Sequence, residues 1–155
     1  MPRSEPAPFD RVPIIVLDTN VVMDWLVFRD PSSAPWANAL AHGQAQWCAS
    51  AAMRDELAHV LARGVGARWA PDMAQLWSKW NRFCSELPQP AISDPAARIR
   101  CSDPTDQMFI DFALAHGARW LVSHDRAVLK LARQARSRGL AILKPTQWTG
   151  GALPP

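Results

Sequence analysis

The stretch Val12-Pro13-Ile14-Ile15-Val16-Leu17-Asp18 decides the fold class of this 155-residue chain. It is a short, continuous aliphatic run that ends at an acidic residue. Strands that are apolar without alternation are typical of parallel sheets whose two faces are both covered. The run is far too short to cross a bilayer, so we expect no membrane segment. It predicts a buried strand with a carboxylate at its carboxyl end.

Helical and strand-like segments alternate along the rest of the chain. Capping residues and breakers predict helices over 20–28, 36–42, 51–63, 71–87, 104–116 and 126–138. Short apolar runs predict strands over 46–49, 120–123 and 141–143, and 98–101 is either a strand or a loop. This alternation predicts an α/β sandwich around a mainly parallel sheet.

Length and composition describe one domain with its own core. Apolar residues make up 48% of the chain, which is enough to fold without disulfides or a structural metal. Half of the prolines lie near the two ends, so we expect a domain over 11–148 and flexible tails over 1–10 and 149–155. The three widely spaced cysteines match neither a disulfide framework nor a zinc pattern, and no secretion signal is recognisable. We therefore expect reduced thiols and a cytoplasmic location.

The formal net charge of +3 is unevenly distributed. Residues 1–118 carry ten basic and thirteen acidic side chains, whereas residues 119–155 carry seven basic side chains and one acidic. Basic residues recur at i, i+4 and i+7 in the predicted helix from 126, as Arg126, Lys130 and Arg133. This stripe is either an ordinary solvated face or a track for phosphates, and the charge alone permits a polyanionic partner without requiring one.

Four acidic residues from distant segments are expected at one edge of the sheet. In open α/β sheets, sites form beyond the carboxyl ends of the strands. Asp18 follows the first strand, Asp125 follows the strand ending at Ser123, and Glu56 lies on the helix after the second strand. Asp106 opens a helix that starts from the same edge if 98–101 is a strand. Each alone is as simply explained as a helix cap or a solvated acid. Together they favour a Mg²⁺ or Mn²⁺ site, the chemistry of phosphodiester hydrolysis.

Four segments carry a family resemblance, in this order: Ile15-Val-Leu-Asp-Thr-Asn-Val-Val22, Asp55-Glu-Leu-Ala-His-Val-Leu61, Ser102-Asp-Pro-Thr-Asp106 and Trp120-Leu-Val-Ser-His-Asp125. Over about residues 13–148 the chain resembles the PIN-domain nucleases, and most closely the VapC-like toxin ribonucleases of bacterial toxin–antitoxin pairs. This resemblance implies a three-layer α/β/α sandwich with about five strands. It also implies cleavage of RNA with Mg²⁺ or Mn²⁺ and pairing with a small antitoxin protein.

The resemblance also implies which residues form the site. The acidic quartet of the family falls on Asp18, Glu56, Asp106 and Asp125, with supporting polar residues at Asn20 and Ser123. The chain departs from the family pattern in having Thr105 and Gln107 where the family has acidic and Asn positions, and Ser123 in place of Thr. We assign Asp106 to the metal, because Asp103 is explained as the helix cap.

The predicted helix over 71–87 carries an apolar band wider than one core contact needs. Core packing explains much of it, and the excess favours a partner, either a second copy in a homodimer or an antitoxin segment. His124, next to Asp125, is interpreted as an ordinary loop histidine.

Three other functions compete with the toxin hypothesis. A PIN-type RNA-processing nuclease outside a toxin–antitoxin system would use the same residues. A phosphohydrolase of the haloacid-dehalogenase type also begins with an acid at a strand end, but it needs a second acid two residues later, where this chain has Asn20. A non-catalytic PIN scaffold is disfavoured by the intact quartet.

Overall fold

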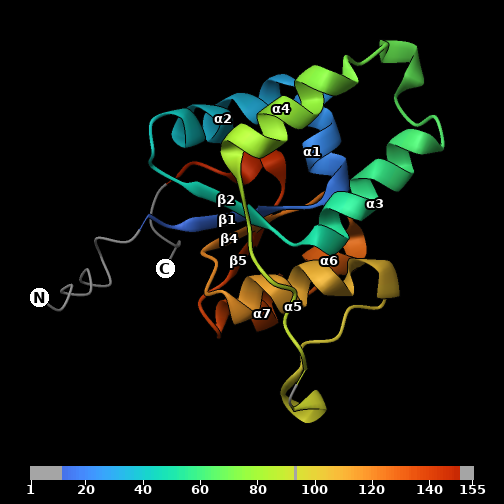
Figure 1. The fold of residues 1–155 in the computed structure, drawn as a ribbon. Coiled ribbons are helices and arrows are strands. Elements are labelled where there is room, and N and C mark those ends of the chain that lie inside the picture. Colours follow the sequence, from blue (N-terminus) through green and yellow to red (C-terminus); the bar gives the residue numbers. More distant parts are fainter. Residues whose placement is uncertain (1–11, 93, 151–155) are drawn as a thin grey trace, which may run out of the picture.

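The structure, a computed structural model, describes residues 12–92 and 94–150 and places their strands in one parallel sheet (Figure 1). The strands, in the spatial order β3-β2-β1-β4-β5, are β1 (Ile14–Leu17), β2 (Gln46–Ala49), β3 (Cys84–Glu86), β4 (Trp120–Val122) and β5 (Ala141–Leu143). The aliphatic strand β1 lies in the centre, with Ile15 paired to Trp47 on one side and Trp120 on the other. The predicted parallel sheet of about five strands is confirmed.

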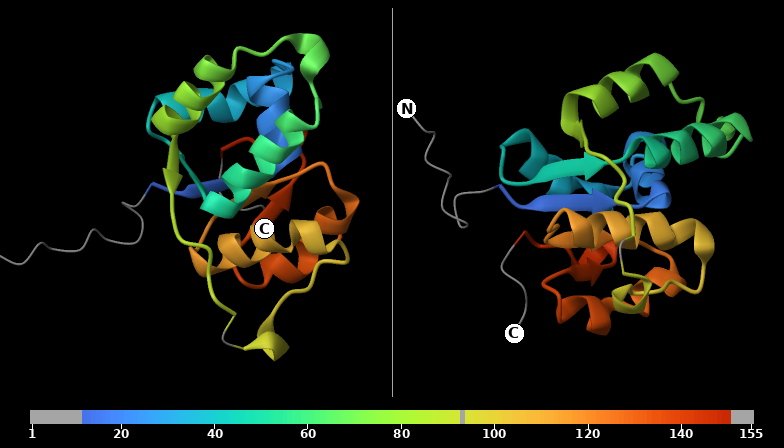
Figure 2. Two further views of the ribbon diagram at one scale, coloured as in Figure 1. Left: turned by 45° about the vertical axis from the view of Figure 1, so that its right-hand side comes forward. Right: turned by 60° about the horizontal axis from the view of Figure 1, so that its bottom comes forward.

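The described residues form seven α-helices. These helices cover the two faces of the sheet, as Figures 1 and 2 show. One face carries α1 (Thr19–Leu26), α2 (Ala34–Ala41), α3 (Ala51–Ala62) and α4 (Met73–Phe83). The other carries α5 (Gln107–Ala115), α6 (Arg126–Leu129) and α7 (Ala132–Arg136). Right-handed crossovers explain this division, because the chain runs from β1 outward to β3 and then returns through α5 to β4 and β5. The result is the predicted three-layer α/β/α sandwich.

Short 3₁₀ turns complete the connections. They are η2 (Pro31–Ser33), η3 (Ala67–Trp69), η4 (Pro95–Ala97), η5 (Pro104–Asp106) and η6 (Pro145–Gln147). Of these, η5 matters for the site, because it brings the chain to the carboxyl edge of the sheet immediately before α5.

Tryptophans account for much of the packing between the sheet and the first helical layer. The Trp47 ring, on β2, packs edge-on against Trp80 of α4 at 4.8 Å between centroids and against Trp25 of α1 at 5.5 Å. Trp77 packs against Trp80 at 5.9 Å. The wide apolar band of the predicted 71–87 helix is therefore largely used inside the protein. Val65, Trp69 and Met73 stay exposed near its start, and Trp69 has 61% of its surface accessible.

One sequence prediction about secondary structure is wrong on this side of the sheet. The helix predicted over 71–87 ends at Phe83, and the chain continues as edge strand β3, pairing with β2. The N–H of Leu87 prolongs this pairing by donating to the carbonyl of Ala49 at 2.9 Å. Apolar residues here fit the helical period and a partly buried edge strand equally well, so tertiary pairing decided the outcome. The segment 98–101, for which the sequence left a strand or a loop open, is a loop.

The helix predicted over 126–138 is also wrong as one continuous element. It divides into α6 and α7, because the N–H of Leu131 bonds three residues back to the carbonyl of Val128 at 3.0 Å and tightens the turn. Val128 and Ala135 are nevertheless buried as the packed side of the pattern.

The remaining expectations concern the ends of the chain and its cysteines. The expected tail over 1–10 and most of that over 149–155 lie outside the described residues. The three cysteines, all within the described part, are free thiols. Within that same part, the structure contains no helix with the length and apolarity that a membrane crossing requires.

Candidate metal centre

Asp18 lies at the carboxyl end of the central strand, where β1 passes directly into α1. Its N–H still belongs to the sheet and donates to the carbonyl of Val122 at 3.1 Å. Its buried side chain caps α1, with one oxygen accepting from the N–H of Val21 at 3.0 Å and the other from the Ser123 hydroxyl. Burial outweighs these hydrogen bonds and raises the pKa of Asp18. A carboxylate in this position is stabilised by a nearby cation.

Ser123 connects two of the acidic segments. Its hydroxyl donates to Asp18, 105 residues away in sequence, and accepts from the backbone N–H of Asp125 at 3.0 Å. The side chain is fully buried at the end of β4. One hydroxyl group therefore fixes the Asp18 carboxylate and the backbone of the Asp125 loop relative to each other.

Three further carboxylates form a compact cluster at the same edge. Asp103, Asp106 and Asp125 each offer one oxygen, and these oxygens all lie within 4.8 Å of one another. Asp125 follows β4 and caps α6 through the N–H of Ala127 at 2.8 Å. Asp103 caps η5 and Asp106 ends it. Asp18 adjoins this cluster, because the Ser123 hydroxyl bonds both the Asp18 carboxylate and the N–H of Asp125.

The cluster carries negative charge that a proton or a cation must offset. Burial, followed by the contact with Asp125, raises the pKa of Asp106 to about 8. The hydrogen bond from protonated Asp106 lowers the pKa of Asp125. The two side chains thus share one proton near neutral pH. Asp106 Oδ2 is buried, and no donor among the described residues bonds to it.

A hard divalent cation fits these donors. The set consists of carboxylate oxygens, without the thiol or imidazole groups that zinc prefers, and this suits Mg²⁺ or Mn²⁺. A cation would meet the free Oδ2 of Asp106 and take the place of the shared proton. The acidic cluster is therefore suited to hold a divalent metal ion.

Besides Asp18 and Ser123, the predicted site residues Glu56 and Asn20 lie outside the compact cluster. Glu56 is half-buried on α3, which starts at the same sheet edge and lies against α5. Asn20 is exposed in the first turn of α1, two residues beyond Asp18. In the part of the chain that the structure describes, the acids grouped at ligand spacing include neither Glu56 nor Asp18.

Asp103 has two roles, where the sequence suggested only one. It caps η5 as expected, because its Oδ1 accepts from the N–H of Thr105 at 3.0 Å and from the Thr105 hydroxyl at 2.7 Å. It also belongs to the acidic cluster, together with Asp106. Assigning Asp103 to the cap alone was therefore incomplete.

His124 has a specific partner that the sequence did not indicate. Its Nε2 lies 2.5 Å from Oδ2 of Asp24 on α1. This contact ties α1 to the loop that carries Asp125. Burial raises the pKa of Asp18, and the positive character of His124 offsets a part of that rise.

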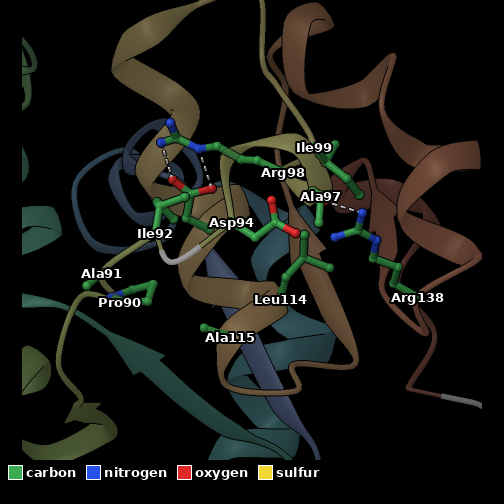
Figure 3. A pocket seen from close by; sticks show the side chains of 11 residues that line it. Pro90, Ala91, Ile92, Asp94, Ala97, Arg98, Ile99, Leu114, Ala115 and Arg138 are labelled. Carbon is green, nitrogen blue, oxygen red and sulfur yellow. Dashed lines mark hydrogen bonds and ion pairs between the residues drawn. The ribbon is translucent and has the colours of Figure 1, made fainter.

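Sequence reasoning also missed Gln107 and the pair formed by Arg98 and Asp111. The Arg98 guanidinium grips the buried Asp111 carboxylate with two bonds, of 2.5 and 3.1 Å, across the hollow drawn in Figure 3. Gln107 connects this pair to the backbone of the preceding loop. A lone acid at position 111, within the otherwise apolar run of α5, was the available signal.

The predicted basic stripe is exposed but interrupted. Arg126, Lys130 and Arg133 all reach solvent, although the break between α6 and α7 falls directly after Lys130. Arg126 follows the cluster residue Asp125 immediately. The stripe is therefore free to contact a ligand at its site-proximal end.

Comparison with known proteins bears on the whole fold. The family model of the PIN domain matches residues 14–127. Among solved structures, a chain in the crystal structure of VapBC2 from Rickettsia felis, bound to a DNA fragment from their promoter, is similar with a TM-score of 0.55. The identity is 16%, covering 83% of this chain and 96% of that chain. No curated protein matches this chain. The resemblance inferred from the four sequence segments is thereby confirmed at the level of family and fold.

Proposed function

Because the chain belongs to the PIN domain family, we propose that it is a Mg²⁺- or Mn²⁺-dependent endoribonuclease and the toxin of a toxin–antitoxin pair. The observation that carries the nuclease proposal is the buried Oδ2 of Asp106, which lacks a donor within a cluster of carboxylates. Such an arrangement is unstable without a proton or a cation, and the chemistry of the donors selects a hard cation.

The roles of the acids follow from their positions. Asp18, Asp106 and Asp125 would hold the ion, and Glu56 would approach it from α3. A bound ion would lower the pKa of a water molecule and offset the charge that develops on the phosphate. Asp106 gives up the proton it shares with Asp125 when the site fills. Ser123 keeps the Asp18 carboxylate oriented by its hydrogen bond.

The substrate is proposed to be RNA, which would reach the acidic cluster over the exposed surface around it. Asn20 lies on that surface beside Asp18 and offers an amide to the strand. On the helices that follow Asp125, positively charged side chains are exposed and would contact the RNA phosphates, namely Arg126, Lys130 and Arg133. We place the protein in the cytoplasm, where RNA and reduced thiols coexist.

The proposed protein partners are a small antitoxin and a second copy of this chain, which would form a homodimer. Apolar side chains remain exposed where α3 leads into α4, namely Val65, Trp69 and Met73. Patches of this kind mark interaction surfaces more often than isolated apolar residues do. The similarity to a chain of a VapBC2 structure supports an antitoxin as partner. A neighbouring gene for a DNA-binding antitoxin would separate the toxin from an RNA-processing nuclease outside such a system.

The Asp18→Asn variant tests the nuclease proposal. Asn caps a helix as well as Asp does, so α1 should persist while the ion loses its central carboxylate. Asp72→Asn is the matched control, because Asp72 caps α4 in the same way, through Gln75 at 3.1 Å, and is exposed.

Total RNA is incubated with Mn²⁺ and each protein, and new ends are mapped. The wild type and Asp72→Asn should cleave with equal rates, and Asp18→Asn should be inactive while keeping its circular dichroism spectrum. Undiminished cleavage by Asp18→Asn refutes the metal assignment, and a wild type without metal-dependent cleavage leaves a scaffold role.

A further inference from the structure

We propose that Arg100 is a phosphate-binding residue, which seats the nucleic-acid backbone in a basic hollow next to the acidic cluster. The identity of the ligand as nucleic acid rests on the proposed function. The residue lies outside the predicted basic stripe and outside the four segments that carry the family resemblance.

The hollow lies between the loop before η5 and the first turn of α5. It has a volume of about 360 Å³ and is lined by Arg98, Arg100, Cys101, Pro104 and Gln107. Two of these residues carry guanidinium groups and none carries a carboxylate. A concave surface of this composition attracts anions.

The hollow adjoins the candidate metal centre. Pro104 lines it and stands in sequence between the cluster acids Asp103 and Asp106. The thiol of Cys101, another lining residue, is close enough to these acids for their charges to contribute to its raised pKa, after burial. A strand that reaches the acids with one phosphate can therefore place a neighbouring phosphate in the hollow.

The two guanidinium groups differ in their availability. Arg98 is committed to the buried Asp111, because both of its bonds are directed at that carboxylate. Arg100 is exposed, and the ion pairs formed by the described residues do not include it. Its planar group of N–H donors is therefore available for a ligand, and it matches the geometry of phosphate oxygens.

Gln107 holds the backbone on both sides of Arg100. Its Oε1 accepts from the N–H of Cys101 at 2.7 Å, and its Nε2 donates to the carbonyl of Ile99 at 2.8 Å. The same Nε2 donates to Asp111 at 3.0 Å. The loop that carries Arg100 is thus tied to α5 before any ligand arrives. Binding then has to order only the Arg100 side chain, which reduces the entropy cost.

A cation at this position has a clear electrostatic purpose. The acids of the cluster repel the phosphates of an approaching strand until a metal ion and basic side chains compensate. Arg126 follows Asp125 directly, and Arg100 precedes Asp103 by three residues. The acidic cluster is therefore bordered along the chain by one exposed arginine before it and one after it.

The salt dependence of RNA binding tests this proposal. A labelled single-stranded RNA is titrated with the full chain in buffer containing Ca²⁺, at several KCl concentrations. Fluorescence anisotropy gives the affinity, and a gel verifies that the RNA stays intact. Arg100→Ala should weaken binding about three- to tenfold at low salt and reduce the slope of log K against log [KCl] by about 0.7. Arg100→Lys should keep most of the slope, because it preserves the charge.

Arg68→Ala is the matched control, since Arg68 is an exposed arginine on η3, at the far end of α3 from the site (Figure 1). It should leave both quantities at the wild-type values. Equal slopes for Arg100→Ala and Arg68→Ala, or a wild type that binds no RNA, overturn the proposal. Binding through Arg100 without cleavage in Mn²⁺ supports this inference and refutes the nuclease. Cleavage with an unchanged KM in Arg100→Ala refutes the inference alone.

Discussion

Replacing Asp106 with Asn should stabilise the metal-free protein and, at the same time, abolish its stabilisation by metal. In the unfolded chain Asp106 ionises near 3.8, whereas in the folded protein its pKa is about 8. Between these two pH values the folded state binds more protons than the unfolded state. Its free energy of unfolding therefore falls as pH rises through this window. The amide side chain of the Asp106→Asn variant carries no ionisable proton, so the variant escapes this penalty.

The size of the effect follows from the shift and from its surroundings. Taken at face value, holding Asp106 protonated in the folded protein at pH 7, where the unfolded chain ionises, would cost on the order of 4 kcal/mol. Asp106 is only half-buried, so solvent screens the cost, and the lowered pKa of Asp125 returns part of it. We expect Asp106→Asn to gain about 1 kcal/mol at pH 7, or about 2–4 °C in Tm.

Thermal unfolding in EDTA and in Mn²⁺, from pH 5 to pH 8, measures both effects. In EDTA the advantage of Asp106→Asn over the wild type should grow with pH. In Mn²⁺ at a hundredfold excess over Kd, the wild type should gain about 2.7 kcal/mol and the variant far less. A variant that is less stable than the wild type in EDTA at pH 8, or one that Mn²⁺ stabilises equally, refutes the reasoning.

Two further predictions concern the residues that support the site. Ser123→Ala removes the donor to Asp18 and should lower the affinity for Mn²⁺ about 10- to 100-fold in a titration. Ser123→Thr retains the hydroxyl and should bind Mn²⁺ nearly normally. Equal affinities of both variants and the wild type would contradict the role of the hydroxyl. Arg98→Ala leaves the buried Asp111 without its cation and should lower the free energy of unfolding by about 2–4 kcal/mol, measured in urea. Asp111→Asn should lower it less. A loss below about 0.5 kcal/mol for Arg98→Ala would show that the protein does not depend on this ion pair.

The sequence predicted the parts of the fold that depend on local pattern. The aliphatic run before Asp18 predicted a strand covered on both faces, which agrees with its position in the centre of the sheet. The rule that parallel strands end at one edge was enough to bring Asp18 and Asp125 to the same region, whereas the expectation for Asp106 depended on a strand over 98–101 that the structure does not contain. These inferences need no knowledge of individual contacts.

Features set by contacts between distant segments were not predictable in this way. Cys84–Glu86 continued the apolar pattern of the helix before it, and only the free edge of β2 turned it into a strand. The partners of Asp111 and His124 lie on other segments and leave no periodic signature. Asp103 reached the cluster because η5 turns tightly, which a capping motif alone does not reveal.

The bond between Ser123 and Asp18 also constrains when the site can exist. It spans 105 residues, and it forms only when β4 has inserted next to β1. A chain emerging during synthesis can therefore fold β1, β2 and their helices while Asp18 and Glu56 still lack Asp125. Long-range closure of this kind comes late, because its loop entropy must be offset by the contacts it completes. A fragment that ends before β4 lacks Ser123 and Asp125 and therefore cannot form the acidic cluster.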